Sequence, residues 1–302
     1  MNENPNPEKR VKFDFEIDFS NGGGIQGQDF RLDLVGDDIT DAALAEYIVT
    51  DLRLLMVKEV RIIKKELLTE NHKRKIKTLG ARARHRLIDV SHTVEHGMIT
   101  YKGLPAPLIC DFLSREESRS RYSEGTEFQI GKIEMVANTG TYVDSPFHRY
   151  AEGKDLSELP LASLADLDGI IVRSTGRALN RTAFGGREIK GKAVLVHTGW
   201  DRHWRTDQYF EDHPFLTEDA AQYLAEEGAA MVGIDSFNID DVTDGRRPVH
   251  SILLGANIPI VEHLRGLAQL PDSGFRFFAV PVKVKHFGTF PVRAFGMIAQ
   301  NG

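Results

Sequence analysis

The chain has 302 residues and a formal net charge of −6, and its hydrophobic fraction of 41% is ordinary for a globular protein. The negative charge argues against nucleic acid as the main partner, and no apolar run reaches the roughly 18 residues that a membrane helix needs. Cys110 is the only cysteine, so no internal disulfide can form. We therefore expect a cytoplasmic protein without a membrane anchor.

The first 70 residues predict a small α/β unit with the order ββαβ. Apolar and charged residues alternate strictly over residues 11–19, which is typical of a half-buried strand. A second strand is expected over 30–36, a helix over 37–57, and a third strand over 60–68. Either Thr40 or Asp41 would cap the helix. Its apolar stripe would comprise Leu44, Tyr47, Ile48, Leu52 and Leu55.

Residues 71–86 are basic and poor in large apolar side chains. They predict a solvated linker, and the alternative is a segment that binds anions. From Leu87 to residue 302 the pattern changes to short apolar segments that read as strands. These segments are RLIDVS, GKIEMVAN, GIIVRS, KAVLVHTG, AAMVGID, IPIVEHL, FRFFAVPVKV and VRAFGMIA.

Helices are few in this larger region. One is clear, with Thr217 as its N-cap and Gly228 after its end, and a shorter one is expected within residues 157–167. Because strands outnumber helices, the region predicts an α/β domain with a mixed sheet. No GxGxxG follows a strand, which argues against a dinucleotide enzyme.

Polar residues of the kind that bind metals gather in NTGTYVDSPFH, residues 138–148. In a regular strand Asn138, Tyr142 and Asp144 would share one face. Pro146 would end that strand and turn the chain, which can bring His148 back toward Asp144. The segment is therefore a candidate metal site at a strand end, and an ordinary Asp-Ser-Pro turn remains the alternative.

A second stretch adds His250 and Glu262. A carboxylate inside the apolar segment IPIVEHL is costly to bury without a partner, which could be a metal ion or an arginine. The alternative is a salt-bridged Glu262 and a core histidine. Together with Asp144 and His148, the two residues would offer a set of two imidazoles and two carboxylates. Such a set suits Zn²⁺, with Mn²⁺ as the other candidate ion.

From about Leu87 onward the chain resembles the cyclase family of metal-dependent hydrolases, which includes bacterial kynurenine formamidase and isatin hydrolase. The family signature is His-x-Gly-Thr-His-x-Asp-x-Pro-x-His. Residues 138–148 keep its Gly-Thr, Asp, Pro and last His, whereas Asn138 and Tyr142 replace its first two histidines. His250 and Glu262 match the downstream His and Glu of the family. The segments VLVHTGW and MVGIDSFNID also resemble family strands.

The resemblance implies a swivelling β/β/α-type domain that uses a metal-activated water to cleave an amide, ester or lactone of a small molecule. It also implies a homo-oligomer, either a dimer or a tetramer. Members with two ions bind the first through the two histidines that are absent here. We therefore expect one ion per chain, held by Asp144, His148, His250 and Glu262. The alternatives are a non-catalytic small-molecule-binding protein and a ring-closing cyclase.

Catalytic roles are expected for His148, Tyr142 and Glu262. Some family members use the last histidine of the signature as a proton shuttle, so His148 is either a ligand or a base. Tyr142 would donate its hydroxyl to the oxyanion where a second ion would otherwise lie. Weaker candidates for proton transfer or for shaping the pocket are His92, Phe147, His197, Trp200, Arg202, His203 and Trp204. No role is assigned to His286, to Arg293 or to the N-terminal unit.

Overall fold

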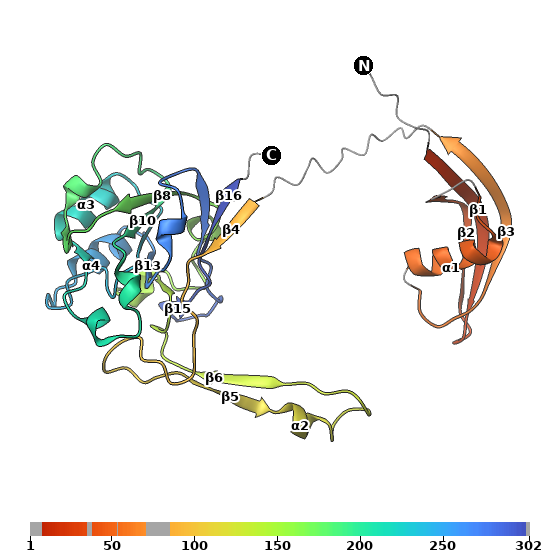
Figure 1. Ribbon diagram of the computed structural model, residues 1–302, viewed down its shortest axis with the longest axis horizontal. Coiled ribbons are helices and arrows are strands. Elements are labelled where there is room, and N and C mark those ends of the chain that lie inside the picture. Colours follow the sequence, from red (N-terminus) through yellow and green to blue (C-terminus); the bar gives the residue numbers. More distant parts are fainter. Residues whose placement is uncertain (1–7, 35–37, 53, 71–84, 300–302) are drawn as a thin grey trace, which may run out of the picture. The chain divides into compact units, whose positions relative to one another are not determined.

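The structure is a computed structural model that describes residues 8–34, 38–52, 54–70 and 85–299. The chain divides into two compact units, Met1–Arg82 and Ala83–Gly302 (Figure 1). Most of the segment predicted as a basic linker, residues 71–84, lies outside the described residues. His85 and Arg86 instead begin strand β4, where they pair with Ala299 and Ile298.

The first unit has the predicted order ββαβ. It consists of β1 (Glu8–Phe19), β2 (Gly24–Asp33), α1 (Asp41–Asp51) and β3 (Val57–Glu70). The three strands form an antiparallel sheet in the order β2-β1-β3. The apolar side chains of β1 pack with α1 in one core, as the alternation over residues 11–19 predicts. That core includes Val11, Phe13, Phe15, Ile17, Leu44 and Ile48.

The prediction of a helix over residues 37–57 was too long at both ends. Thr40 is the N-cap and its Oγ1 accepts the Ala43 amide at 3.2 Å, but α1 ends at Asp51. The last helical turns are lost because β3 pairs with β1 from Val57 onward, opposite Phe19. Leu55, expected on the buried stripe, is therefore 82% exposed.

The second unit is built on a nine-stranded mixed sheet in the order β15-β7-β13-β12-β10-β8-β14-β16-β4. Four central strands, β8, β10, β12 and β13, are parallel, and the strands at both edges are antiparallel. The predicted mixed α/β fold is thus confirmed. The strands are β4 (His85–Asp89), β7 (Tyr142–Asp144), β8 (Leu167–Arg173), β10 (Lys192–His197), β12 (Met231–Ile234), β13 (Ile260–Glu262), β14 (Phe275–Phe278), β15 (Thr289–Pro291) and β16 (Phe295–Ala299).

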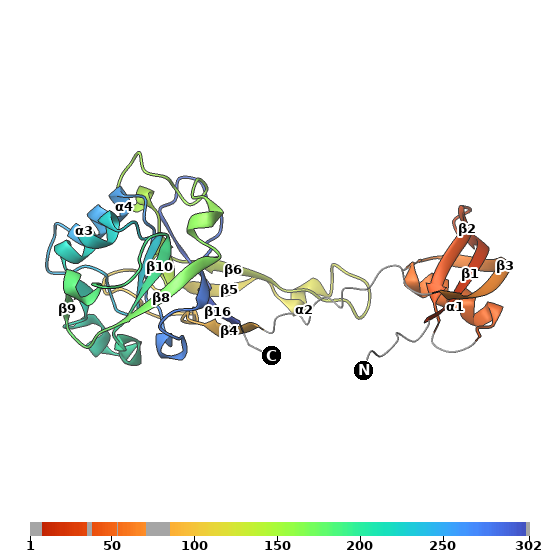
Figure 2. The ribbon, with the colours of Figure 1, turned by 90° about the horizontal axis from the view of Figure 1, so that it is seen from above.

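Both faces of the parallel strands are buried. On β10, Val194 and Val196 belong to the core that includes residues of α3 (Glu218–Glu226) and α4 (Pro248–Gly255), whereas Ala193 and Leu195 belong to the opposite core. The two helices lie on the same side of the sheet (Figures 1 and 2). Helix α3 was expected. Helix α4 was not, and Pro248 at its first turn is the one local signal for it.

Shorter elements complete the unit. Strands β9 (Ala178–Leu179) and β11 (Phe215–Leu216) pair with each other, and so do β5 (Leu108–Leu113) and β6 (Ile130–Glu134). The β5–β6 hairpin and α2 (Arg115–Ser118) project from the rest of this unit as an arm (Figures 1 and 2). Single-turn 3-10 helices are η1 (Pro146–His148), η2 (Leu161–Ser163), η3 (Arg181–Ala183), η4 (Trp200–His203), η5 (Asp207–Phe210) and η6 (Leu267–Gln269).

The short helix predicted within residues 157–167 is only the 3-10 turn η2. Pro160 stands as its N-cap. The Ala165 amide still donates to the Leu161 carbonyl, but Asp166 then adopts a left-handed backbone with φ of 57°, so the helix does not continue. Within the described part of the chain, no helix is long and apolar enough to cross a membrane.

Candidate metal centre

Strand register gathers four polar side chains on one face of the sheet. Strand β7 lies between β13 and β15, with Tyr142 opposite Glu262 and Asp144 opposite Thr289. Opposite residues on neighbouring strands share a face, as do residues two apart on one strand. Accordingly, the Tyr142 hydroxyl donates to Glu262 Oε2 at 2.6 Å, and the Thr289 hydroxyl donates to Asp144 Oδ1.

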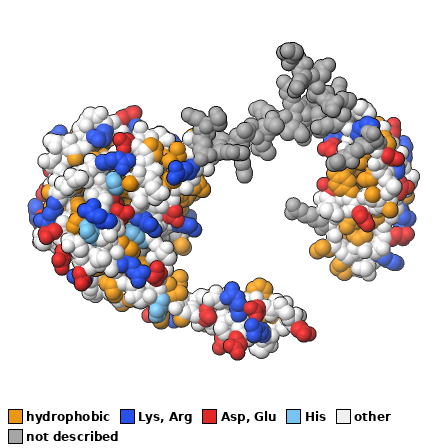
Figure 3. Space-filling view, in the orientation of Figure 1, with side chains coloured by type: hydrophobic (Ala, Val, Ile, Leu, Met, Phe, Trp, Pro, Cys, Tyr) orange, Lys and Arg blue, Asp and Glu red, His pale blue; other side chains and the backbone are white. Residues whose placement is uncertain are grey.

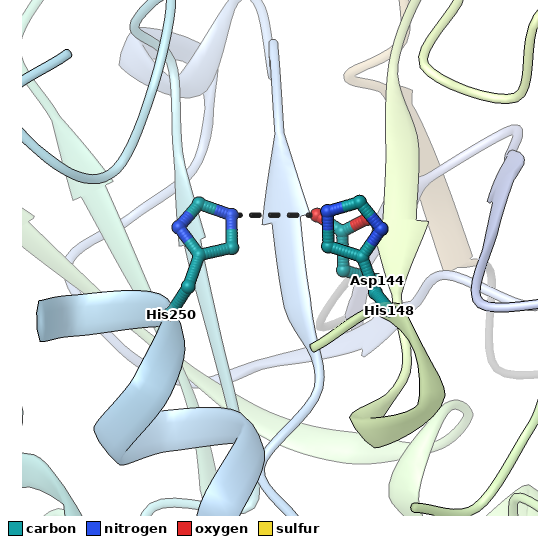
Figure 4. Close-up of side chains that lie close together, drawn as sticks. All are labelled: Asp144, His148 and His250. Carbon is teal, nitrogen blue, oxygen red and sulfur yellow. Dashed lines mark ion pairs between the residues drawn. The ribbon is translucent and has the colours of Figure 1, made fainter. Parts of the chain in front are cut away.

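The two histidines reach the same place from different elements. Pro146 begins η1 after β7, and this turn leaves His148 Nδ1 3.8 Å from Asp144 Oδ1. His250 comes from α4, and its Nε2 lies 3.8 Å from Asp144 Oδ2 (Figure 4). Asp144, His148 and His250 each offer a ligand atom, and these three atoms lie within 4.8 Å of one another.

Hydrogen bonds hold both imidazoles in one orientation. His250 Nδ1 bonds to Asp240 Oδ2 at 2.6 Å, and Asp240 also accepts the amides of Val249 and His250 in the first turn of α4. His148 Nδ1 lies 2.9 Å from the Thr289 hydroxyl, whose own proton points to Asp144. Asp240 and the Thr289 hydroxyl accept the Nδ1 protons, so both rings present Nε2 to the site, an arrangement typical of metal-binding histidines. His250 Nε2 would give up its own proton when a cation binds.

The donor set fits a cation. Asp144 is fully buried, and its Oδ2 has no hydrogen-bond partner among the described residues, although His250 Nε2 lies 3.8 Å away. A buried carboxylate oxygen without a partner is costly, and a metal ion bound to both atoms would remove that cost. Imidazole nitrogen and carboxylate oxygen are ligands that suit Zn²⁺ and Mn²⁺.

Glu262 stands slightly apart from this group. Its Oε1 lies 3.8 Å from His250 Nε2 but accepts the Ile239 amide at 2.7 Å, and its Oε2 accepts the Tyr142 hydroxyl. Both of its oxygens thus have donors, and its role as a fourth ligand stays a prediction. The single hydroxyl proton of Tyr142 points to Glu262, and its donation to an oxyanion stays a prediction.

Burial and neighbouring carboxylates shift the pKa values at this site. Burial disfavours the charged form of His250, but Asp144, Asp240 and Glu262 outweigh it and raise its pKa to about 10. Burial and then Asp144 raise the pKa of Glu262, with His250 opposing them. Burial, Glu262 and Asp144 raise the pKa of Tyr142 well above its usual value, so Tyr142 is a neutral phenol that donates to Glu262.

These side chains lie at a pocket of about 380 Å³. Four of the five predicted site residues line it, namely Tyr142, His148, His250 and Glu262, and Asp144 is buried beside them. The other lining residues are Tyr101, Lys102, Gly103, Leu104, Asn138, Arg149, Asn238 and Arg247. Among these, Arg247 and Asn238 were not singled out from the sequence; neither were Asp240 and Thr289, which support the histidines.

The weaker candidates do not line this pocket. His197 instead lies 3.1 Å from an Arg173 nitrogen and 3.9 Å from Asp235. His92 stacks on Trp204 with ring centroids 3.8 Å apart, and burial lowers its pKa to about 3. The pocket lining also lacks Phe147, Trp200, Arg202 and His203. Arg293, left without a role above, pairs with Asp89 on β4.

Comparison with known proteins agrees with this geometry. Residues 88–241, just over half of the chain, match the family Cyclase, described as "Putative cyclase". A kynurenine formamidase from Bacillus cereus is 27% identical over 208 residues, covering 68% of this chain and 95% of the relative.

Two solved structures are similar in fold. Isatin hydrolase A from Labrenzia aggregata bound to benzyl benzoate superposes with a TM-score of 0.62 at 21% identity, over 74% of this chain and 98% of that one. A structure titled as a potential metal-dependent hydrolase with cyclase activity has a TM-score of 0.56 at 25% identity, over 72% and 100%. With a family match over more than half of its residues, the chain belongs to the Cyclase family.

Proposed function

We propose that this protein is a metal-dependent hydrolase that cleaves an amide, ester or lactone bond of a small molecule. The observation that carries the proposal is the buried Asp144 Oδ2, which has no hydrogen-bond partner among the described residues and faces His250 Nε2 beside a pocket. A pocket of about 380 Å³ suits a small substrate. Relatives named kynurenine formamidase and isatin hydrolase, and a structure titled as a metal-dependent hydrolase, support the reaction class.

One ion per chain is proposed, with Asp144, His148 and His250 as ligands and Glu262 as a fourth. Zn²⁺ is the first candidate and Mn²⁺ the second. When bound, such an ion polarises the substrate carbonyl and lowers the pKa of water to about 7. Asn138 and Tyr142 stand where the family signature has histidines, which supports a single ion.

The protein's own residues position ligands and move protons. Asp240 fixes the ring of His250, and Thr289 fixes His148 and Asp144 together. Hydrolysis releases a proton when water adds to the carbonyl, and the departing amine or alcohol takes one up. If Glu262 is not bound to the ion, its position at the pocket and its raised pKa suit it to accept that proton and return it. Tyr142 acts through Glu262 by its 2.6 Å hydrogen bond.

His148 is the alternative base. Its side chain is 36% exposed at the pocket, and its Nε2 is free because Nδ1 is held by Thr289. The variant His148→Gln distinguishes a metal-ligand role of His148 from a role as general base. If His148 is a ligand, this change lowers metal affinity. If His148 is only the base, the metal stays bound and the maximal rate falls.

A screen of formamides, lactones and cyclic imides tests the proposal directly. Metal-loaded protein is expected to hydrolyse at least one class, and His250→Ala is expected to abolish that turnover. Asn138 and Tyr142 favour a second candidate, a small-molecule-binding protein without catalysis. Tight binding of these compounds without turnover would support that candidate. Turnover in the ring-closing direction would support a cyclase that uses the same groups.

We also propose that the protein is a homo-oligomer, as a dimer or tetramer. The arm formed by β5 and β6 exposes apolar side chains along both strands, including Phe112 (72% exposed) and Ile133 (57%). A two-stranded hairpin is only marginally stable by itself, and exposed apolar patches mark contact surfaces. Light scattering coupled to gel filtration measures the mass, and a monomer at micromolar concentration would contradict the proposal.

A further inference from the structure

Arg247 lies at the pocket beside the candidate metal centre. It is the N-cap residue of α4, three residues before His250, and its side chain lines the same pocket. Its backbone is left-handed, with φ of 52° and ψ of 58°, a conformation that residues other than glycine rarely adopt. Such a strained backbone often marks a functional position.

Arg247 forms no ion pair with an acidic side chain among the described residues, although its charge contributes to the lowered pKa of Asp244. Its hydrogen bonds are long, 3.4 Å to Asn238 Oδ1 and 3.5 Å to the Asp241 carbonyl. Arg247 also interacts with the Tyr101 side chain, another lining residue, through a hydrogen bond and through its charge. Both effects oppose burial, which raises the pKa of the Tyr101 phenol. Arg247 is therefore a half-buried cation whose hydrogen-bond partners among the described residues are neutral groups.

The adjacent Arg246 is a useful contrast. Its guanidinium lies 2.8 Å from Asp244 and 3.3 Å from Glu218, so acidic side chains of the protein surround it. It does not line the pocket. Arg246 thus forms ion pairs with acidic side chains of the protein, whereas Arg247 forms none among the described residues.

The other two cations at the pocket, Lys102 and Arg149, are exposed. Lys102 lies 3.8 Å from Asp207 and over the ring of Phe210, and Arg149 bonds to Ser251 at 3.1 Å. On the face of the larger unit seen in Figure 3, Lys and Arg side chains lie next to histidines. Arg149 and Arg247 both bond only to neutral groups among the described residues. Of the two, Arg247 is the half-buried one, and it stands three residues before His250.

We propose that Arg247 binds a carboxylate carried by the substrate away from the scissile bond, so that the enzyme acts on acidic amides, esters or lactones. The proposal rests on the proposed function and names the substrate class of the same site. A guanidinium can hold a carboxylate by two parallel hydrogen bonds, which fixes orientation as well as position. Because Arg247 and His250 are three residues apart at one helix end, this contact would orient the substrate carbonyl relative to the metal ligands.

The kinetic test compares two formamides that differ only in the anion, 3-formamidobenzoate and formanilide. Arg247→Gln is expected to raise KM for 3-formamidobenzoate by about 10- to 100-fold, the usual range for a lost hydrogen bond to a charged group. It should change KM for formanilide by less than about threefold, and Arg246→Gln should change neither. Equal losses on both substrates, or no loss on either, would overturn the proposal.

A binding measurement tests the carboxylate site at Arg247 independently of the hydrolase activity. Isothermal titration of wild type is expected to show benzoate binding at least about tenfold tighter than benzamide, and Arg247→Gln is expected to remove that preference. If wild type cleaves neither formamide but keeps this preference, the hydrolase assignment fails and the anion site stands. If wild type binds both compounds equally, the anion site fails whatever the turnover.

Discussion

Replacing Tyr142 by phenylalanine removes one hydroxyl from a fully buried pair. Glu262 Oε2 then loses its donor, and the carboxylate keeps only the Ile239 amide on Oε1. A hydrogen bond to a charged group contributes roughly 1.5–3 kcal/mol to stability. We expect Tyr142→Phe to lower the free energy of unfolding by about 2 kcal/mol, which corresponds to a fall in Tm of roughly 4–8 °C for a unit of this size.

The same change acts on the proton of Glu262. The Tyr142 hydroxyl lowers the pKa of Glu262 against the raising effect of burial, so its loss raises that pKa further. The acid limb of the pH–rate profile should therefore move to higher pH and turnover at neutral pH should fall. The metal content should not change, because Tyr142 is not one of the three residues that offer ligand atoms in the cluster.

Three measurements check this prediction: thermal unfolding by circular dichroism, metal content, and the pH dependence of kcat. Tyr150→Phe is the matched control, since the Tyr150 hydroxyl donates to the Ser251 carbonyl at an exposed position. Its effect on Tm should be less than about a third of that of Tyr142→Phe. An unchanged Tm together with an unchanged pH profile in Tyr142→Phe would refute the reasoning.

Four further predictions concern other parts of the molecule. Thr289→Val should weaken metal binding about 10- to 100-fold in a calorimetric titration while Thr289→Ser stays near wild type, and equal losses in both would contradict the positioning role. Asp240→Ala removes the acceptor of His250 and of two amides of α4, so it should cost more than about 2 kcal/mol in urea unfolding. His92 has a pKa of about 3 in the folded protein, so the unfolded chain takes up a proton on this residue more readily. The free energy of unfolding should therefore fall between pH 6.5 and pH 3. His92→Phe should flatten this pH dependence in urea titrations, and an unchanged pH dependence would contradict the prediction. Phe112→Ser on the exposed arm should shift the mass measured by light scattering toward the monomer, and an unchanged mass would remove Phe112 from the interface.

Much of the larger unit's fold could be predicted from local pattern. Short apolar runs such as KAVLVHTG became strands buried on both faces, because parallel strands between two layers need apolar residues on each side. The helix over residues 37–57 failed because strand pairing with β1 outweighed helix propensity after Asp51. Helix α4 was missed because its eight residues are too short and too apolar for periodicity to distinguish a helix from a strand.

The candidate site was predictable only in part. Pro146 indicates a turn that returns His148 toward Asp144, and the structure has that turn. The partner of both residues, Thr289, lies 145 positions after Asp144 and meets it only through the register of β7 and β15. Arg247 has no local sequence feature that separates it from Arg246. Tertiary structure decides which of the two arginines faces the pocket, and the local sequence pattern does not reveal this.

Metal content tests the central claim most directly. Protein loaded with Zn²⁺ or Mn²⁺ and then freed of loose ions by gel filtration is analysed by inductively coupled plasma mass spectrometry. We expect about one ion per chain in wild type and a large loss in both Asp144→Asn and His250→Ala, with circular dichroism to confirm that the variants fold. Wild type that retains no ion, or variants that retain as much as wild type, would contradict the account.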